Sequence, residues 1–116
     1  MPTTRTKGNA AEDRAVSALR ERGYTIHERN WRLGEGEIDI VAHEGGDWVF
    51  VEVRASYDGI DAALESVGKG KQGRLRRLAA AYLAAHDLGE VAHRIDLVVI
   101  DLKTNALEIL THAVGW

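Results

Sequence analysis

Two short runs rich in β-branched residues, joined through a Gly-Gly pair, constrain the fold of this chain most strongly. The runs span residues 36–41 and 48–54, and Gly45-Gly46 lies between them. A Gly-Gly pair in this position indicates a tight turn, because glycine adopts the positive φ angles that two-residue hairpin loops require. The sequence therefore predicts an antiparallel β-hairpin.

A turn centred on Gly45-Gly46 also predicts the register, with Glu44 opposite Asp47 and Asp39 opposite Glu52. Because side chains alternate along a strand, one face then carries the charged pairs and the other is wholly apolar. The first face holds Asp39/Glu52, Glu37/Arg54, Val41/Phe50 and His43/Trp48, and the second holds Ile38/Val53, Ile40/Val51 and Ala42/Val49.

The facing carboxylates of Asp39 and Glu52 point to a metal site. Directly opposite residues of an antiparallel pair have Cβ atoms about 4.5–5.5 Å apart, so two carboxylates there repel each other. A hard divalent cation such as Mg²⁺ offsets that repulsion, and it binds through carboxylates, water and substrate phosphate. The alternative is that both side chains line the solvated face of an ordinary hairpin. The register alone leaves both interpretations open.

The motif Gly36-Glu37-Ile38-Asp39, followed by Phe50-Val51-Glu52-Val53-Arg54, resembles the YraN-type family of small bacterial proteins. That family is similar in motif to Holliday-junction resolvases and to the restriction-endonuclease-like D…(D/E)-x-K nucleases. The resemblance implies an α/β fold with a three-layer restriction-endonuclease-like core (αβββαβ), a mixed central sheet and an extra C-terminal edge strand. Further matching positions along the chain are Gly8, Glu12, Asn30, Lys71-Gln72 and Arg94-Ile95-Asp96.

The resemblance also implies a function, namely a metal-dependent endonuclease that acts on DNA, branched or structured DNA included. The cofactor would be Mg²⁺ or Mn²⁺. Asp39 and Glu52 would hold it, and the backbone carbonyl of Val53 would add a ligand. Glu12 would support the metal through a water molecule.

Arg54 departs from the nuclease motif, which has lysine two residues after the glutamate. Arginine carries the charge but does not readily lose a proton. We therefore expect Arg54 to brace a carboxylate or clamp the scissile phosphate. Lys71, from the following helix, is the candidate for orienting the attacking water.

Composition bounds the remaining choices. The chain has 116 residues, enough for one modest core, and we expect a flexible tail at 1–8 and a single endonuclease-like domain at 9–116. The sequence has no cysteine, which excludes disulfides and Cys-ligated zinc and fits a cytoplasmic protein. No apolar run reaches the roughly 20 residues of a membrane span. With a formal net charge of −3, binding to nucleic acid must depend on a local patch.

Periodicity and turn residues predict the other elements. Glu12 falls on the apolar stripe of the first helix, yet Asn9-x-x-Glu12 is also a capping box, and both roles stay open. The near-continuous apolar run 95–100 indicates a buried strand, parallel to 48–54 by a right-handed crossover, with Arg94 as the structural partner of Asp96. The expected elements are a helix from Asn9 to Arg22 closed by Gly23, a strand from Tyr24 to Trp31, a helix from Gln72 to His86 closed by Gly89, and an edge strand from Leu107 to Thr111 before an exposed Gly115-Trp116 end.

One basic patch surrounds the glycines at the start of the second helix. Basic residues at a helix N-terminus oppose the helix dipole unless an anion binds there, and phosphate is the obvious anion. A solvated basic face is the alternative interpretation. The patch comprises Lys69, Lys71, Arg74, Arg76 and Arg77, of which we expect Lys69, Lys71, Arg74 and Arg77 to bind nucleic acid.

Three functional classes follow from these residues. The first is the DNA endonuclease, for which a resolvase role would favour a two-fold homodimer. The second is a nucleic-acid-binding module that keeps the nuclease fold without turnover, for which Arg54 is the main support. The third is a structural domain in which Glu37 and Arg54 form only a cross-strand ion pair. His27 and His43 are expected to be structural.

Overall fold

A five-stranded mixed sheet forms the centre of the protein, and its strand order follows the chain, β1-β2-β3-β4-β5. The computed structural model describes residues 3–114, with side chains from Ala10 onward, so Met1, Pro2 and the predicted exposed end at Gly115-Trp116 lie outside the described residues. The elements are α1 (Thr3–Glu21), β1 (Thr25–Leu33), β2 (Gly36–Glu44), β3 (Asp47–Ser56), α2 (Ile60–Glu65), α3 (Lys69–Ala85), β4 (His93–Asp101) and β5 (Leu107–Leu110).

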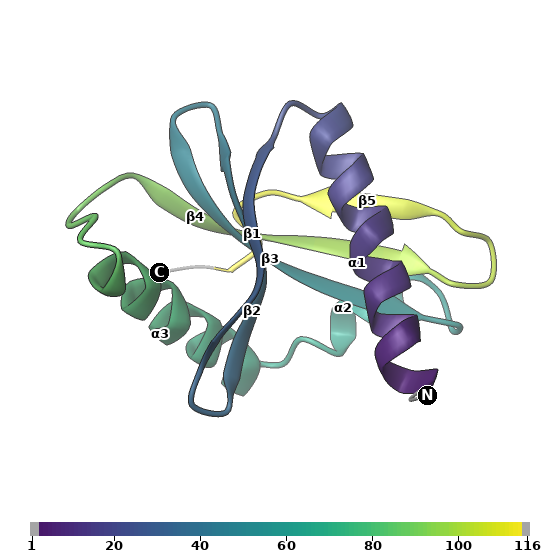
Figure 1. Cartoon of the computed structure of the whole chain (residues 1–116). Coiled ribbons are helices and arrows are strands. Elements are labelled where there is room, and N and C mark those ends of the chain that lie inside the picture. The colour runs from purple at the N-terminus through teal and green to yellow at the C-terminus, as the bar shows by residue number, and fades with distance from the viewer. Residues whose placement is uncertain (1–2, 115–116) are drawn as a thin grey trace.

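Helices α1 and α3 cover opposite faces of this sheet, and the β1–β2 hairpin runs across the direction of β4 and β5, so the sheet is strongly twisted (Figure 1). Each helix buries the apolar stripe that its sequence predicts, which confirms the three-layer α/β core. The stripe of α1 is Ala15, Val16 and Leu19, packed with Ile40, Val49, Val51, Val98 and Ile100. The stripe of α3 is Leu75, Leu78, Ala79, Tyr82 and Leu83, packed with Ile38, Val41, Phe50, Ile95 and Leu97.

The hairpin formed by β2 and β3 has the predicted register. Its ladder runs from Glu44 opposite Asp47 to Ile40 opposite Val51. Gly45 and Gly46 have φ angles of 58° and 90°, the positive values that a tight hairpin turn needs. The β2–β3 ladder ends there, one pair short of the expected Asp39/Glu52 pair.

Beyond the ladder, β2 departs from a regular strand, and the predicted faces are wrong at its first residues. Ile38 packs on the α3 face whereas Ile40 packs on the α1 face, although regular alternation would place both on one face. In β1, Asn30 has a φ angle of 57° between the pairs Arg29–Ile40 and Trp31–Ile38, so it lies across from Asp39. The two strands change direction together at this point.

The same departure overturns the expected cross-strand pair of Glu37 and Arg54. Glu37 instead lies opposite Arg32 of β1 and forms an ion pair with it at 3.0 Å. Gly36, one residue earlier, lies so close to α3 that a Cβ atom there would be 2.8 Å from a methyl carbon of Leu78. The first residues of β2 therefore follow β1 and α3 rather than β3.

Both long helices begin earlier than predicted. Helix α1 starts at Thr3, so Asn9 is inside the helix and cannot cap it, and residues 3–8 belong to α1 rather than to a tail. The capping-box pattern misplaces the start because Thr3 to Lys7 contains no residue that breaks a helix. Helix α3 starts at Lys69 rather than Gln72, with Gly68 as its N-cap.

The helix ends follow one hydrogen-bond pattern. Gly23 closes α1 as predicted, since Tyr24 N–H donates to the Leu19 carbonyl and Gly23 N–H to the Arg20 carbonyl. At the end of α3 the equivalent residue is Asp87 (φ 54°), not Gly89, because aspartate tolerates the left-handed conformation.

Strand β4 runs parallel to β3 and β5 pairs antiparallel at the sheet edge, both as predicted. Arg94 and Asp96 on β4 are buried and form the expected ion pair, with Nε 3.1 Å from Oδ1. Tyr24 donates a 2.8 Å hydrogen bond to Asp96, and Arg94 also pairs with Glu44 and Asp47 at the hairpin turn. This network ties β4 to the turn of the β2–β3 hairpin.

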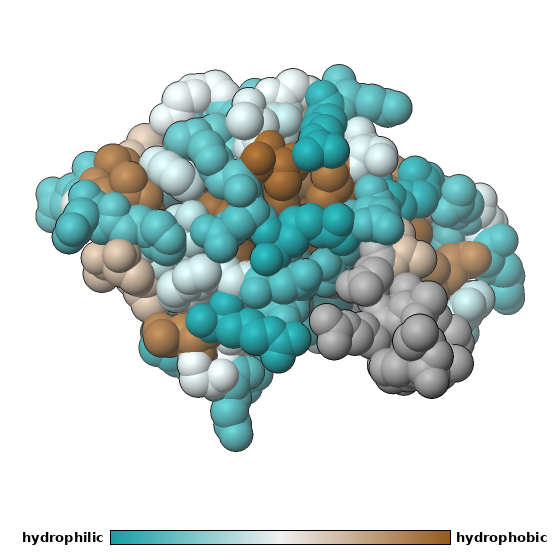
Figure 2. Space-filling view, in the orientation of Figure 1, coloured by the Kyte–Doolittle hydropathy of each residue, from teal (hydrophilic) through white to brown (hydrophobic). Residues whose placement is uncertain are grey.

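No helix among residues 3–114 is both long and apolar enough to span a membrane. The face of the molecule seen in Figure 2 is largely hydrophilic, with apolar side chains in separate patches.

Candidate active site

A cleft of about 850 Å³ brings together the residues for which the sequence predicts chemistry. It lies between α1, the strands β2 to β4 and the beginning of α3. Glu12, Asp39, Glu52, Val53, Arg54 and Lys71 all line it, so every predicted metal-binding and catalytic residue shares one cavity. These residues come from four elements, namely α1, the hairpin strands β2 and β3, and α3.

Asp39 lies where β2 leaves β3. Its Oδ2 atom accepts a 2.8 Å hydrogen bond from the backbone N–H of Val53. Burial, followed by repulsion from the nearby Glu52 carboxylate, raises the pKa of Asp39 from 3.8 to about 9. Val53 thus contacts Asp39 through its N–H, and the metal-ligand role of its carbonyl stays a prediction.

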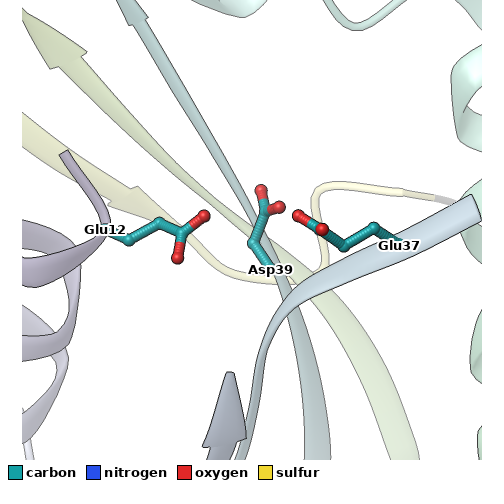
Figure 3. A group of neighbouring side chains, drawn as sticks. All are labelled: Glu12, Glu37 and Asp39. Atoms are coloured by element: carbon teal, nitrogen blue, oxygen red, sulfur yellow. The ribbon is translucent and has the colours of Figure 1, made fainter. Parts of the chain in front are cut away.

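Three carboxylates, that of Asp39 among them, converge on one another. Glu12 from α1, Glu37 and Asp39 from β2 point toward one another (Figure 3), and one oxygen from each lies within 4.8 Å of the others. The side-chain amide of Asn30 donates to both Glu12 oxygens at 3.0 Å and to Glu37 at 3.3 Å. We call Glu12, Glu37 and Asp39 the carboxylate cluster.

Sequence reasoning missed Glu37 as a member of this site. Regular alternation would place Glu37 and Asp39 on one face, but it also assigned Arg54 as the partner of Glu37. The irregular backbone at Asn30 and Asp39 brings Glu37 against Asn30 and Arg32 instead. The available signal was the resemblance itself, because both Glu37 and Asn30 fall on its motif positions.

The carboxylate of Glu52 forms ion pairs with two basic side chains. It is only 4% exposed, and its Oε2 atom lies 3.0 Å from Arg54 Nη2 and 3.5 Å from Lys71 Nζ. Arg54 therefore braces a carboxylate, one of the two roles expected for it. Among the described residues, its buried Nε–H has no hydrogen-bond partner.

The donor atoms of the carboxylate cluster fit a hard divalent cation. All three members of the carboxylate cluster offer oxygen atoms, the ligand type that Mg²⁺ and Mn²⁺ prefer, at a spacing that one ion can bridge. The raised pKa of Asp39 shows that the negative charge there is poorly compensated by the surrounding protein. A cation would supply that compensation.

The basic patch divides into two parts. Lys71 points into the cleft, whereas Arg74 and Arg77 line a separate hollow of about 380 Å³ that also contains Leu33 and Gly36. Lys69 is exposed in the first turn of α3, where Gly68 makes no side-chain cap. The patch thus extends from the cleft along α3, a direction that a phosphate backbone can follow.

His27 and His43 do not line the cleft. Their rings pack with Trp48, and His27 Nε2 lies 2.5 Å from His43 Nδ1. Burial, followed by the charge of His27, lowers the pKa of His43. These contacts fit the structural role expected for both residues.

Comparison with known proteins assigns the family. The model of the family described as "Uncharacterised protein family UPF0102" matches residues 11–100. The chain belongs to the UPF0102 family. This membership confirms the resemblance to YraN-type proteins, and the range that the UPF0102 model matches includes the whole carboxylate cluster, Glu52, Arg54 and Lys71.

Individual UPF0102 proteins are similar over nearly their full length. One from Chloroflexus aurantiacus is 42% identical over 117 residues, which cover 99% of this chain and 96% of the relative. One from Roseiflexus castenholzii is 47% identical over 105 residues, covering 88% of this chain and 84% of the relative. One from Mycobacterium marinum is 39% identical over 111 residues, covering 93% and 91%.

Proposed function

We propose that this UPF0102 protein is a Mg²⁺- or Mn²⁺-dependent endonuclease that hydrolyses phosphodiester bonds in DNA, branched or structured DNA included. The observation that carries the proposal is that Glu12 and Asp39, which converge with Glu37, line one cleft together with Glu52 and its two cations. Such a combination offers oxygen ligands to a metal and positive charge to a phosphate.

Different residues would bind the metal and the phosphate. The carboxylate cluster would hold the cation, with Glu52 beside it. A bound divalent cation supplies a Lewis acid that activates water and stabilises charge on the scissile phosphate. Lys71 and Arg54 would turn from Glu52 toward that phosphate, because a cation on the carboxylates removes part of their attraction to Glu52.

A cleavage assay tests this proposal directly. Linear, nicked and four-way-junction DNA should be incubated with and without Mn²⁺, using the wild type, Asp39→Asn and the control Asp13→Asn. Asp13 is an exposed neighbour of Glu12 on the same helix and does not line the cleft. Cleavage by the wild type and the control, but not by Asp39→Asn, is the expected result. Failure of the wild type to cut any of these substrates with Mn²⁺ contradicts the proposal.

The second candidate is a DNA-binding module without turnover. The ion pairs of Arg54 and Lys71 with the same Glu52 oxygen favour it, because they neutralise a carboxylate that a metal would otherwise use. Binding of junction DNA without cleavage would support this module. For either function a homodimer with two-fold symmetry would engage paired strands symmetrically.

A further inference from the structure

The lining of the cleft has an apolar part besides the carboxylates and the cations paired with Glu52. It consists of Tyr57 from the β3–α2 loop, Leu102 from the β4–β5 loop, and Ala10 and Ala11 of α1, and Arg14 and Asn105 also line the cleft. We call Tyr57, Leu102, Ala10 and Ala11 the apolar wall. A metal ion and a phosphate group would fill only part of about 850 Å³, which leaves room for a ligand group that contacts the apolar wall.

Two side chains of the apolar wall are exposed to solvent, whereas large apolar side chains are usually buried. Tyr57 is 58% exposed and Leu102 is 39% exposed. They are two of the four large hydrophobic side chains that are exposed among the described residues, and both lie in this cleft. The other two are Leu33 and Leu64, which do not line it.

Hydrogen bonds hold the two loops that carry the wall. Leu102 N–H donates to the Ser56 carbonyl at 2.9 Å, which places Leu102 beside the residue that precedes Tyr57. Asp58 N–H donates to Ser56 Oγ at 3.0 Å and so tightens the loop around Tyr57. On the other side, Arg14 Nε donates to Asn105 Oδ1 at 2.8 Å and fastens the β4–β5 loop to α1.

We propose that the apolar wall binds an unpaired base next to the scissile phosphate, with the base stacked on Tyr57. This inference rests on the proposed function and adds the substrate class, a single-stranded or locally unpaired DNA strand. A nucleotide matches both parts of the lining. Its anionic phosphate suits the cations, and its base, which is flat and apolar on its faces, suits the apolar wall. A base inside a duplex is already stacked on its neighbours, so it can reach Tyr57 only when unpaired or extruded.

The test measures binding separately from cleavage. Fluorescence anisotropy with Ca²⁺ in place of Mn²⁺ should compare a single-stranded oligonucleotide, the same strand made of abasic nucleotides, and a blunt duplex. The proteins are the wild type, Tyr57→Ala, Tyr57→Phe and Leu64→Ala, the last removing an exposed leucine outside the cleft. Thermal melting of each variant verifies that it is folded.

Tyr57→Ala should weaken binding of the single strand about tenfold or more, since stacking on an aromatic ring contributes strongly to binding of single strands. Tyr57→Phe keeps the ring and Leu64→Ala leaves the cleft intact, so both should bind like the wild type. The abasic strand and the blunt duplex should be insensitive to Tyr57→Ala. Cleavage of the single strand with Mn²⁺ should follow the same order.

Two outcomes overturn the inference alone. They are single-strand binding that Tyr57→Ala leaves unchanged, and an equal loss on the abasic strand, which would mean that no base is stacked there. If the wild type binds and cuts DNA in either case, the proposed function survives. If the wild type binds none of the three nucleic acids and cuts neither them nor four-way-junction DNA, the proposed function fails and the base site fails with it.

Discussion

The carboxylate of Asp39 accepts a 2.8 Å hydrogen bond from the backbone N–H of Val53, just beyond the last residues of the ladder that joins β2 to β3. A side chain thus continues the connection between two strands after their backbones have separated. The bond orients the carboxylate at the point where Glu12 and Glu37 also converge. This relationship makes the proposed metal site depend on the backbone of β3 as well as on the carboxylates.

Measurements of metal binding should show whether the cation is held by the carboxylate cluster or by the Asp39/Glu52 pair. Calorimetric titration of Mn²⁺ should show binding to the wild type that Asp39→Asn loses. Glu37→Gln should weaken it by about tenfold or more if Glu37 is a ligand, because removal of one charged ligand lowers affinity for a hard cation. Asp13→Asn serves as the control. Equal binding by the wild type and Asp39→Asn would rule out the site.

The free energy of unfolding should decrease as pH rises, because of Asp39. Its pKa in the folded protein is raised from 3.8 to about 9, so its protonated form stabilises the fold fully below about pH 4, and this stabilisation is lost as pH rises toward 9. Asp39→Asn cannot ionise, and its stability relative to the wild type should therefore increase with pH, by at most about 1.4 kcal/mol per unit. Urea unfolding at several pH values without metal checks this. A difference that stays constant with pH would contradict it, and saturating Mn²⁺ should reduce the trend.

Salt dependence should locate the DNA-binding surface. Each phosphate contact contributes about 0.9 to the slope of log K against log salt on duplex DNA and about 0.7 on single strands. Replacing Lys69, Arg74 and Arg77 with alanine should weaken binding and make the slope shallower. Arg20→Ala with Arg22→Ala, exposed residues at the end of α1 and just after it, is the control. A slope that the triple variant leaves unchanged would place the phosphate contacts elsewhere.

Arg54 and Lys71 should differ in their effects on cleavage. Arg54→Lys keeps a cation beside Glu52 and restores the nuclease motif, so Mn²⁺-dependent cleavage should be preserved or raised. Lys71→Ala should lower cleavage by about a hundredfold if Lys71 orients the water or the phosphate. Single-turnover rates with junction DNA measure both effects. If Lys71→Ala cuts as fast as the wild type, Lys71 has no part in the chemistry.

Local sequence determined the hairpin, the parallel partner of β3 and the apolar stripes of both long helices. Gly45-Gly46 sets the register through the turn that it forms, and the alternation of side chains determines which face of the hairpin each residue occupies. The near-continuous apolar run from Ile95 to Ile100 indicates a strand buried on both faces, and the intervening helix favours a parallel crossover. These features follow from contacts between residues near one another in the chain or from a single repeating pattern.

Only the tertiary structure added Glu37 to the predicted site residues and brought Tyr57 and Leu102 to the same cleft. Glu37 joins Glu12 and Asp39 where Asn30 has a positive φ angle and the β1–β2 ladder lacks a pair between Asn30 and Asp39, an irregularity that no periodic pattern predicts. Tyr57 and Leu102 line the same cleft because their loops follow the paired ends of β3 and β4, where Leu102 N–H donates to the Ser56 carbonyl. The positions of such residues depend on how separate elements pack and bend, whereas sequence patterns report only the period of each element by itself.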